Sequence, residues 1–213
     1  FDLDGTILDS EQMWKKATIL ALESRGIFLD AETAKALKRQ LRGLGLIEFA
    51  KVMKSKFNLT AKPQEFISEQ NRLSKELYEK EIKFIDGFTD FYKKVEKRKL
   101  KIGIATNADK KTVDLAKNKF NLETFFGSHI YCIEDVNNIC KPEPDLFLHA
   151  AKKLDVPPAQ CVVIEDSACG ITAAKKAGMF CIGINTAKDK ESLYQADLIV
   201  DHYHEINLDT LII

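Results

Sequence analysis

Two pairs of acidic residues in this sequence have the types and spacing needed for chemistry on a charged substrate. Asp2 and Asp4 are separated by one residue in Phe-Asp-Leu-Asp-Gly-Thr, so an extended chain projects both carboxylates to the same side. Glu165 and Asp166 are adjacent and directly follow an apolar run. Carboxylates held side by side repel each other unless one is protonated or a cation lies between them, and hard oxygen ligands of this kind suit Mg²⁺. Taken singly, each pair is equally typical of a solvated turn or a helix cap.

Three further residues have the character of an anion-binding group. Thr106 and Asn107 follow the apolar end of a predicted strand, where a hydroxyl and main-chain N–H groups can receive an anion. Lys141 lies in Cys-Lys-Pro-Glu-Pro, and the prolines restrict where its compact positive charge can reach. Taken singly, Thr106 and Asn107 are also common helix caps, and Lys141 is also typical of an exposed surface.

The elements that must position these residues begin at about residue 88, where apolar runs of β-type residues alternate with helical patterns. This alternation predicts an α/β fold, with a Rossmann-like parallel sheet covered by helices on both faces. The predicted strands are residues 1–3, 101–106, 130–133, 161–164, 180–184 and 198–200. The helices predicted among them include residues 107–120 and residues 168–177.

Between residues 10 and 86 the pattern is helical throughout, and no convincing strand is present. The predicted helices cover residues 14–22, 30–40 and 46–57, and a further one begins at Pro63. We therefore predict an all-helical domain of residues 10–86, inserted into a core domain made of residues 1–9 and 87–213. The chain is expected to cross between the two domains at Asp9–Ser10 and at Asp86–Gly87.

The predicted strands bring the polar residues together, because open α/β sheets bind ligands at the carboxyl ends of their strands. One cleft would then hold acids for a metal, an anion cradle and a lysine, which is the composition of a phosphoryl-transfer site. The chain resembles the haloacid dehalogenase superfamily, in the branch with a helical cap that includes β-phosphoglucomutase and phosphoglycolate-type phosphatases. Four motifs occur in the family's order over essentially the whole chain: Asp-Leu-Asp-Gly-Thr, the strand end at Thr106, Lys-Pro-Glu-Pro and Glu-Asp-Ser.

The resemblance implies a covalent mechanism that depends on Mg²⁺. Asp2 would attack phosphorus and become an aspartyl phosphate, and Asp4 would protonate the leaving oxygen and then activate water. The Mg²⁺ ion would be held by Asp2, by Asp166 and by the main-chain carbonyl of Asp4. Glu165 would be an extra ligand, as in the mutases.

The resemblance also implies how the substrate is held. Thr106, the main-chain N–H of Asn107 and Lys141 would bind the phosphoryl oxygens. The helical domain would act as a cap whose closure excludes water and selects the substrate.

Two departures from the mutase pattern favour hydrolysis of a small phosphorylated metabolite. The histidine that mutases carry on the first cap helix corresponds here to Trp14, and the arginine of their cap loop corresponds to Leu46. A phosphosugar mutase and a non-catalytic protein that keeps the fold remain as alternatives. Lys38, Arg39 and Arg42 are compatible both with contacts to an anionic substrate and with a solvated helix face.

Composition narrows the remaining classes of function. Lys and Arg number 32 and so do Asp and Glu, and this zero net charge argues against a nucleic-acid partner. No apolar stretch reaches the roughly 18 residues of a membrane span. The five cysteines contain no Cys-x-x-Cys pair, which favours buried thiols in a reducing, cytoplasmic compartment.

We expect a monomer or a weak homodimer. We also expect a few apolar residues ahead of Phe1, since the chain begins inside a predicted strand.

Overall fold

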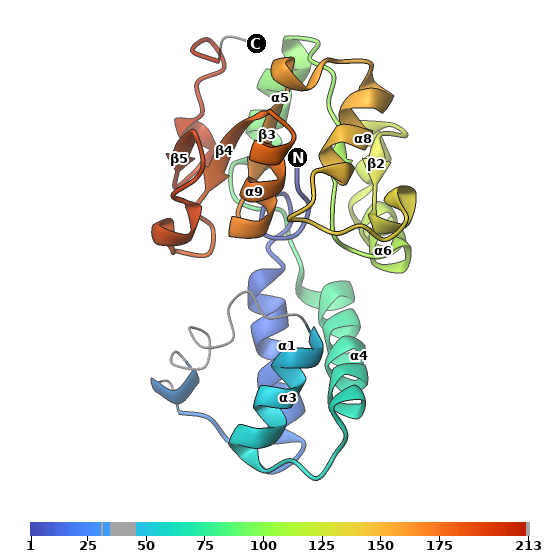
Figure 1. Cartoon of the computed structure of the whole chain (residues 1–213), viewed down its shortest axis with the longest axis vertical. Coiled ribbons are helices and arrows are strands. Elements are labelled where there is room, and N and C mark those ends of the chain that lie inside the picture. Colours follow the sequence, from blue (N-terminus) through green and yellow to red (C-terminus); the bar gives the residue numbers. More distant parts are fainter. Residues whose placement is uncertain (31, 35–45, 212–213) are drawn as a thin grey trace. The chain divides into compact units, whose positions relative to one another are not determined.

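The computed structural model describes residues 1–30, 32–34 and 46–211. The chain divides into two compact units (Figure 1). The core unit contains Phe1–Asp9 and Lys83–Ile213, and the helical unit contains Ser10–Ile82. No helix in the described ranges is both long enough and apolar enough to cross a membrane.

The second crossing between the units lies before Lys83 rather than at the predicted Asp86–Gly87. Residues 84 and 85 already belong to the core unit, because Phe84 forms an antiparallel bridge with Leu8 and the N–H of Ile85 donates to Ile7 O at 2.8 Å.

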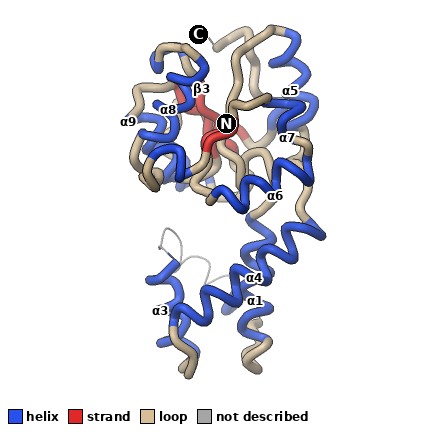
Figure 2. Tube along the Cα trace, turned by 90° about the vertical axis from the view of Figure 1, so that its right-hand side faces the viewer, coloured by secondary structure: helices blue, strands red, loops and turns tan. Residues whose placement is uncertain are grey.

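The core unit is built on parallel strands that lie inside it (Figure 2). One group pairs β1 with β2, and the other has the order β3-β4-β5. The strands are β1 Ile104–Ala105, β2 Ile130–Tyr131, β3 Val162–Glu165, β4 Phe180–Ile184 and β5 Leu198–Val200.

Phe1 and Asp2 join the two groups of strands. The Phe1 ammonium donates to Gly103 O at 2.8 Å, and Asp2 N–H donates to Ile164 O at 3.0 Å. The predicted strand of residues 1–3 thus takes its place in the sheet at Phe1 and Asp2, but it is too short to form a regular strand. Leu3 O accepts the N–H groups of Ile7 and Leu8, both at 2.9 Å, so the chain turns back immediately after Asp2.

The strands β1 and β2 are shorter than predicted. β2 ends at Tyr131 because Cys132 N–H donates to the Asp135 carboxylate at 2.9 Å, which starts the 3-10 helix η1 at Ile133–Val136. β1 pairs with β2 over the same two positions, Ile104 with Ile130 and Ala105 with Tyr131.

Helices cover both sides of the strands, as predicted (Figure 2). One apolar cluster packs α8 and α9 against the sheet, and an aromatic cluster with Phe88, Phe91 and Phe126 lies around Phe1. The helices are α5 Phe88–Lys97, α6 Lys110–Phe120, α7 Leu122–Phe126, α8 Asp145–Leu154 and α9 Ala168–Lys176, with 3-10 turns η2 Pro158–Gln160, η3 Lys190–Leu193 and η4 Tyr203–Glu205.

Helix α6 begins at Lys110, directly after the segment 107–109 in which its start was predicted. Asp109 caps it by accepting the N–H of Thr112 at 2.8 Å, which satisfies one of the free donors of the first turn. Thr106 and Asn107 are therefore not the caps of this helix.

The helical unit consists of α1 Glu11–Glu23, α3 Leu46–Phe57 and α4 Pro63–Glu81 in its described part. α1 and α3 both pack against α4, and Leu22, Met53 and Phe66 lie in the shared core.

Several predictions in this unit fall outside the described residues. Asp30 accepts the N–H of Thr33 at 2.7 Å, in the manner of the predicted cap. Most of the predicted helix over residues 30–40 lies outside the described ranges, as do Lys38, Arg39, Arg42 and the side chains of Trp14 and Leu46.

Candidate active site

A buried ion-pair network joins three of the predicted site residues. Lys141 Nζ lies 2.5 Å from Asp2 Oδ1 and 3.0 Å from Glu165 Oε1. The side chains of Lys141, Asp2 and Glu165 are only 2%, 9% and 1% exposed. The ammonium also lies 4.6 Å from the centre of the Phe147 ring, a cation–π contact that further favours its charged form. The alternative of an exposed surface lysine is thus wrong.

The site contains more negative than positive charge, and the pKa values reflect this. Burial raises the pKa of Asp2 to about 7, although the Lys141 ammonium acts in the opposite direction. Burial, with the charges of Glu165 and Asp2, raises the pKa of Asp166 well above its usual range. Burial disfavours the charged form of Lys141, but the carboxylates of Asp2 and Glu165 outweigh it and raise the pKa of this lysine. An additional cation would therefore be favourable here.

Both carboxylate oxygens of Glu165 are engaged in contacts that fix its position. Oε1 receives the Lys141 ammonium, and Oε2 accepts the N–H and the hydroxyl of Ser167 at 2.6 and 2.8 Å. A Cβ at Gly170 would overlap this carboxylate, so the glycine at the start of α9 leaves the space that Glu165 fills. Glu165 thereby holds Lys141 in place next to Asp2.

Asp166 faces the loop that carries Asp4. Its carboxylate accepts the Thr6 hydroxyl at 3.3 Å, and a Cβ at Gly5 would overlap it. Gly5 has φ +87°, in the left-handed region that favours glycine. The loop and the carboxylate of Asp166 therefore lie in direct contact, with the half-buried Asp4 beside them.

Asn107 connects the end of β1 to the loop of Lys141. Its side-chain oxygen accepts the N–H of Lys141 at 2.8 Å, and its side-chain NH₂ donates to Lys141 O at 3.4 Å. Thr106 is buried, and its hydroxyl accepts the N–H of Ala108 at 3.0 Å. The predicted anion cradle is thus contiguous with the lysine, because Asn107 follows Thr106 in the chain.

The donor set fits a hard divalent cation such as Mg²⁺. Within the described ranges, His, Cys, Asp and Glu side chains form no group of three or more that could hold a metal. Mg²⁺ does not require such a group, because it retains several waters and takes one or two carboxylates. Asp2 and Asp166 provide two carboxylates in a place with excess negative charge. The loop of Asp4 packs against Asp166 at the same place.

Two side-chain contacts were not identified from sequence, although Ser167 was one of the two candidate caps for the helix after Glu165-Asp166. The Ser167 hydroxyl accepts Gly170 N–H as the cap of α9 and also donates to Glu165. The sequence does contain a signal for the turn at Ser167. Ser167 and Gly170 follow Glu165-Asp166 at the point where a strand passes into a capped helix, and this pattern predicts a tight turn. The side-chain role of Asn107 has no such signal, since its partner lies 34 residues away.

A profile of the family described as haloacid dehalogenase-like hydrolase matches residues 1–184. The chain belongs to this family. The hydrolase is 32% identical over 184 residues to a probable pseudouridine-5'-phosphatase of Drosophila melanogaster, covering 84% of this chain and 77% of the relative. It is also 29% identical to the β-phosphoglucomutase of Bacillus subtilis, covering 99% of this chain and 92% of that enzyme.

Solved structures support the same assignment of the hydrolase. It is similar to a hydrolase of family IA, variant 3, from Entamoeba histolytica, with a TM-score of 0.81 and 26% identity. The match covers 98% of this chain and 94% of the solved one. The expected α/β fold with an inserted helical region is thereby confirmed.

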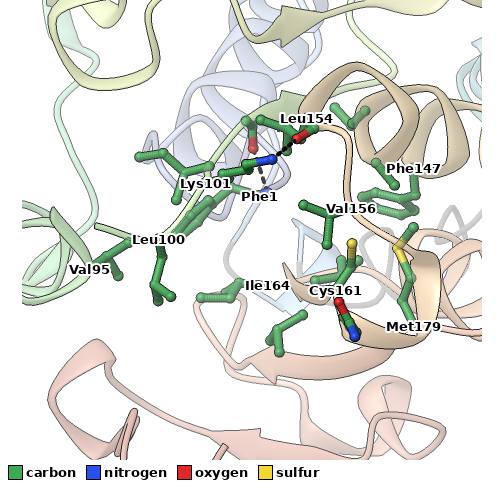
Figure 3. A pocket seen from close by; sticks show the side chains of 18 of the residues that line it. Phe1, Val95, Leu100, Lys101, Phe147, Leu154, Val156, Cys161, Ile164 and Met179 are labelled. Atoms are coloured by element: carbon green, nitrogen blue, oxygen red, sulfur yellow. Dashed lines mark hydrogen bonds between the residues drawn. The ribbon is translucent and has the colours of Figure 1, made fainter. Parts of the chain in front are cut away.

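An apolar pocket of about 340 Å³ lies beside Phe1, and Asp2, Glu165 and Asp166 are not among the residues that line it (Figure 3). It is lined by Phe147, Ile164 and Met179, among others, and by the start of the chain at Phe1. The Phe1 ammonium is buried there, and burial lowers its pKa to about 6. An apolar pocket of this kind offers no groups for phosphoryl transfer, so the chemistry is assigned to the carboxylate cluster.

Proposed function

We propose that this hydrolase is an Mg²⁺-dependent phosphatase that releases phosphate from a small phosphomonoester through an aspartyl phosphate on Asp2. The observation that carries the proposal is the contact between Asp2 and the buried Lys141 at 2.5 Å. Burial keeps water from screening this pair, and a carboxylate attacks a phosphate dianion only where such positive charge compensates their repulsion.

Asp2 provides the nucleophilic oxygen, and Lys141 provides the charge that the phosphoryl oxygens approach. Glu165 and Asn107 hold Lys141 at its ammonium and at its main chain, respectively. Thr106 and the main-chain N–H of Asn107 bind further phosphoryl oxygens at the end of β1. The substrate phosphate would therefore be held from two sides of the nucleophile.

Asp4 donates a proton to the leaving oxygen and later removes one from the attacking water. It lies two residues after Asp2, in the loop against which Asp166 packs. The attack of Asp2 breaks the bond between phosphorus and the ester oxygen, and water then attacks the phosphorus of the aspartyl phosphate. Asp2 is regenerated as the carboxylate when inorganic phosphate leaves.

Asp2, Asp166 and the main-chain oxygen of Asp4 are the groups that would hold Mg²⁺. The ion supplies positive charge next to the phosphoryl group. Glu165, which the family resemblance offers as an extra ligand, is assigned here to Lys141, because both of its oxygens are occupied by Lys141 and Ser167.

Hydrolysis is favoured over isomerisation by the composition of α1. The sequence of this helix, Glu-Gln-Met-Trp-Lys-Lys-Ala-Thr-Ile-Leu-Ala-Leu-Glu, contains no histidine to exchange protons with Asp4. The relatives named for pseudouridine 5'-phosphate and for 6-phosphogluconate suggest a phosphorylated sugar or nucleoside-like metabolite as the substrate class.

The test is phosphate release from a panel of phosphorylated sugars, nucleotides and short acids, measured with Mg²⁺ and with EDTA. We expect release from one or a few monoesters, loss of release with EDTA, and no turnover by Asp2→Asn. Isomerisation of a phosphosugar that needs a bisphosphate activator would instead identify a mutase. Absence of both activities would indicate a non-catalytic protein.

A further inference from the structure

The loop that carries Asp4 folds back on itself within a few residues. Gly5 N–H donates to Leu8 O at 2.7 Å, and the N–H groups of Ile7 and Leu8 both donate to Leu3 O at 2.9 Å. These bonds close the loop, but they all lie within it. They do not by themselves fix the loop relative to the strands that carry Asp2 and Asp166.

Two hydroxyl groups from the C-terminal part of the chain hold this loop from outside. Thr186, two residues after the end of β4, donates its hydroxyl to Gly5 O at 2.7 Å. Tyr203, at the start of η4, donates its hydroxyl to Thr6 O at 3.0 Å. The two accepting carbonyls are consecutive and immediately follow Asp4, so both bonds act on the peptide groups that determine where Asp4 lies.

The environment of Tyr203 makes its hydroxyl a rigid anchor. The residue is fully buried, and its ring packs 5.2 Å from Phe91 and 5.8 Å from Phe88, measured between ring centres. Burial, followed by the charges of Asp2 and Asp166, raises the pKa of Tyr203 well above its usual range. The hydroxyl therefore remains a proton donor close to the acidic cluster.

We infer that Thr186 and Tyr203 are positioning residues that hold Asp4 where it can protonate the leaving oxygen. This inference rests on the proposed phosphatase function. A general acid acts only within hydrogen-bond reach of the atom that it protonates, and a displacement of about 1 Å can reduce a rate about 100-fold. The Thr6 hydroxyl on Asp166 and the N–H of Ile85 on Ile7 O also tie the loop to its surroundings, but the bonds from Thr186 and Tyr203 are the ones that act on the two carbonyls following Asp4.

The loss of rate caused by a misplaced Asp4 depends on how much the leaving group needs a proton. p-Nitrophenolate leaves readily without protonation, whereas the oxygen of phenyl phosphate needs it more. Loss of a correctly placed acid should therefore slow phenyl phosphate far more than p-nitrophenyl phosphate. A loss of folded enzyme would slow both esters by the same factor.

The experiment compares kcat/KM for both esters in Tyr203→Phe and Thr186→Val. We expect a decrease of about tenfold for phenyl phosphate and of less than about threefold for p-nitrophenyl phosphate, in line with the cost of a misplaced general acid. Thr186→Ser, which keeps the hydroxyl, should restore the wild-type ratio of the two esters. Tyr92→Phe is the matched control, because its hydroxyl bonds to the exposed Glu96 and its ring lies in the same aromatic cluster. Equal losses on both esters, or no loss on either, would overturn the inference.

Hydrogen exchange at the N–H groups of Ile7 and Leu8 provides a readout that needs no activity. We expect faster exchange at both in Tyr203→Phe and in Thr186→Val, and unchanged exchange in Tyr92→Phe. A wild-type protein that releases phosphate from neither aryl ester and from no metabolite of the panel would reject the proposed function. Hydrogen exchange would still decide whether the two hydroxyls hold the loop. Unchanged exchange in both variants would show that they do not.

Discussion

At the scale of single residues, the proposed chemistry depends on one buried lysine placed between two carboxylates. A buried charge is stable only when its partners are present, and removal of one partner leaves the others uncompensated. Under the proposed mechanism, Lys141 therefore contributes to both stability and catalysis. Asp2, with its pKa raised to about 7 by burial, depends on this lysine for much of its negative charge at neutral pH.

Replacing Lys141 by Met tests this dependence, because the change removes the ammonium and keeps most of the volume. We expect phosphatase activity to fall by about 1,000-fold, as for loss of a key electrostatic group, and the free energy of unfolding to fall by about 3 kcal/mol. Phosphate release and urea denaturation measure the two effects. Lys190→Met is the control, because its ion pair with Asp201 is more than a third exposed on each side, and surface pairs contribute little. Similar effects in both variants would contradict the role given to Lys141.

Glu165 and Asp166 are neighbours to which the structure gives different tasks. Glu165 contacts Lys141 and Ser167, whereas Asp166 lies against Gly5 and the loop of Asp4. The amide variants Glu165→Gln and Asp166→Asn keep the shape of each side chain. We expect Asp166→Asn to weaken Mg²⁺ binding by about tenfold or more, and Glu165→Gln to change it by less than about threefold.

Calorimetric titration of Mg²⁺ into the two variants measures this difference without relying on turnover. Both variants should lose activity, so activity alone does not separate them. Equal weakening of Mg²⁺ binding would show that Glu165 is also a ligand, as the family resemblance implies.

At the scale of elements, the sheet has an apolar groove next to its first residue. The pocket of about 340 Å³ is lined on one side by residues 101–103 and on the other by Cys161 and Val162. Phe1 bonds to Gly103 O and Asp2 bonds to Ile164 O, so a parallel ladder continued in front of Phe1 would run along this groove.

Adding Val-Ile in front of Phe1 should therefore stabilise the protein. Burial of one such side chain contributes about 1.5–3 kcal/mol, so we expect the free energy of unfolding to rise by about 2 kcal/mol. Urea denaturation of the extended chain measures the change, with Ser-Gly as the matched extension of equal length. If the two extensions had the same effect, the groove would not accept an apolar strand.

The elements themselves were predictable wherever the signal is local. α3 has the predicted bounds, and Thr106 and Asp166 directly follow β1 and β3 as expected, with Glu165 as the last residue of β3. The ends of β1 and β2 were not predictable, because a capping turn at Cys132 competes with the ladder. The contacts of Asn107, Thr186 and Tyr203 were also not predictable, since they join residues 34, 181 and 197 positions apart and their types carry no sequence signal.

At the scale of the whole molecule, all residues assigned to the chemistry lie in the core unit, although the helical unit interrupts that unit after Asp9. The two points where the chain leaves and re-enters are adjacent, because Asp9 N–H donates to Lys83 O at 2.9 Å. The core unit also has its own apolar and aromatic clusters. It therefore contains what a compact domain needs to fold by itself.

Replacing residues 10–82 with Gly-Gly should accordingly leave a folded core unit that unfolds cooperatively in urea. The slope of the denaturation curve should be smaller than for the whole chain, because less surface is exposed on unfolding. We expect the shortened protein to keep Mg²⁺-dependent hydrolysis of p-nitrophenyl phosphate, since Asp2, Asp4 and Lys141 remain, and to lose its preference among the metabolites of the panel. Asp2→Asn in the shortened protein is the control for residual contaminating activity. A core unit that folds but shows no hydrolysis would mean that the helical unit supplies a group needed for the chemistry itself.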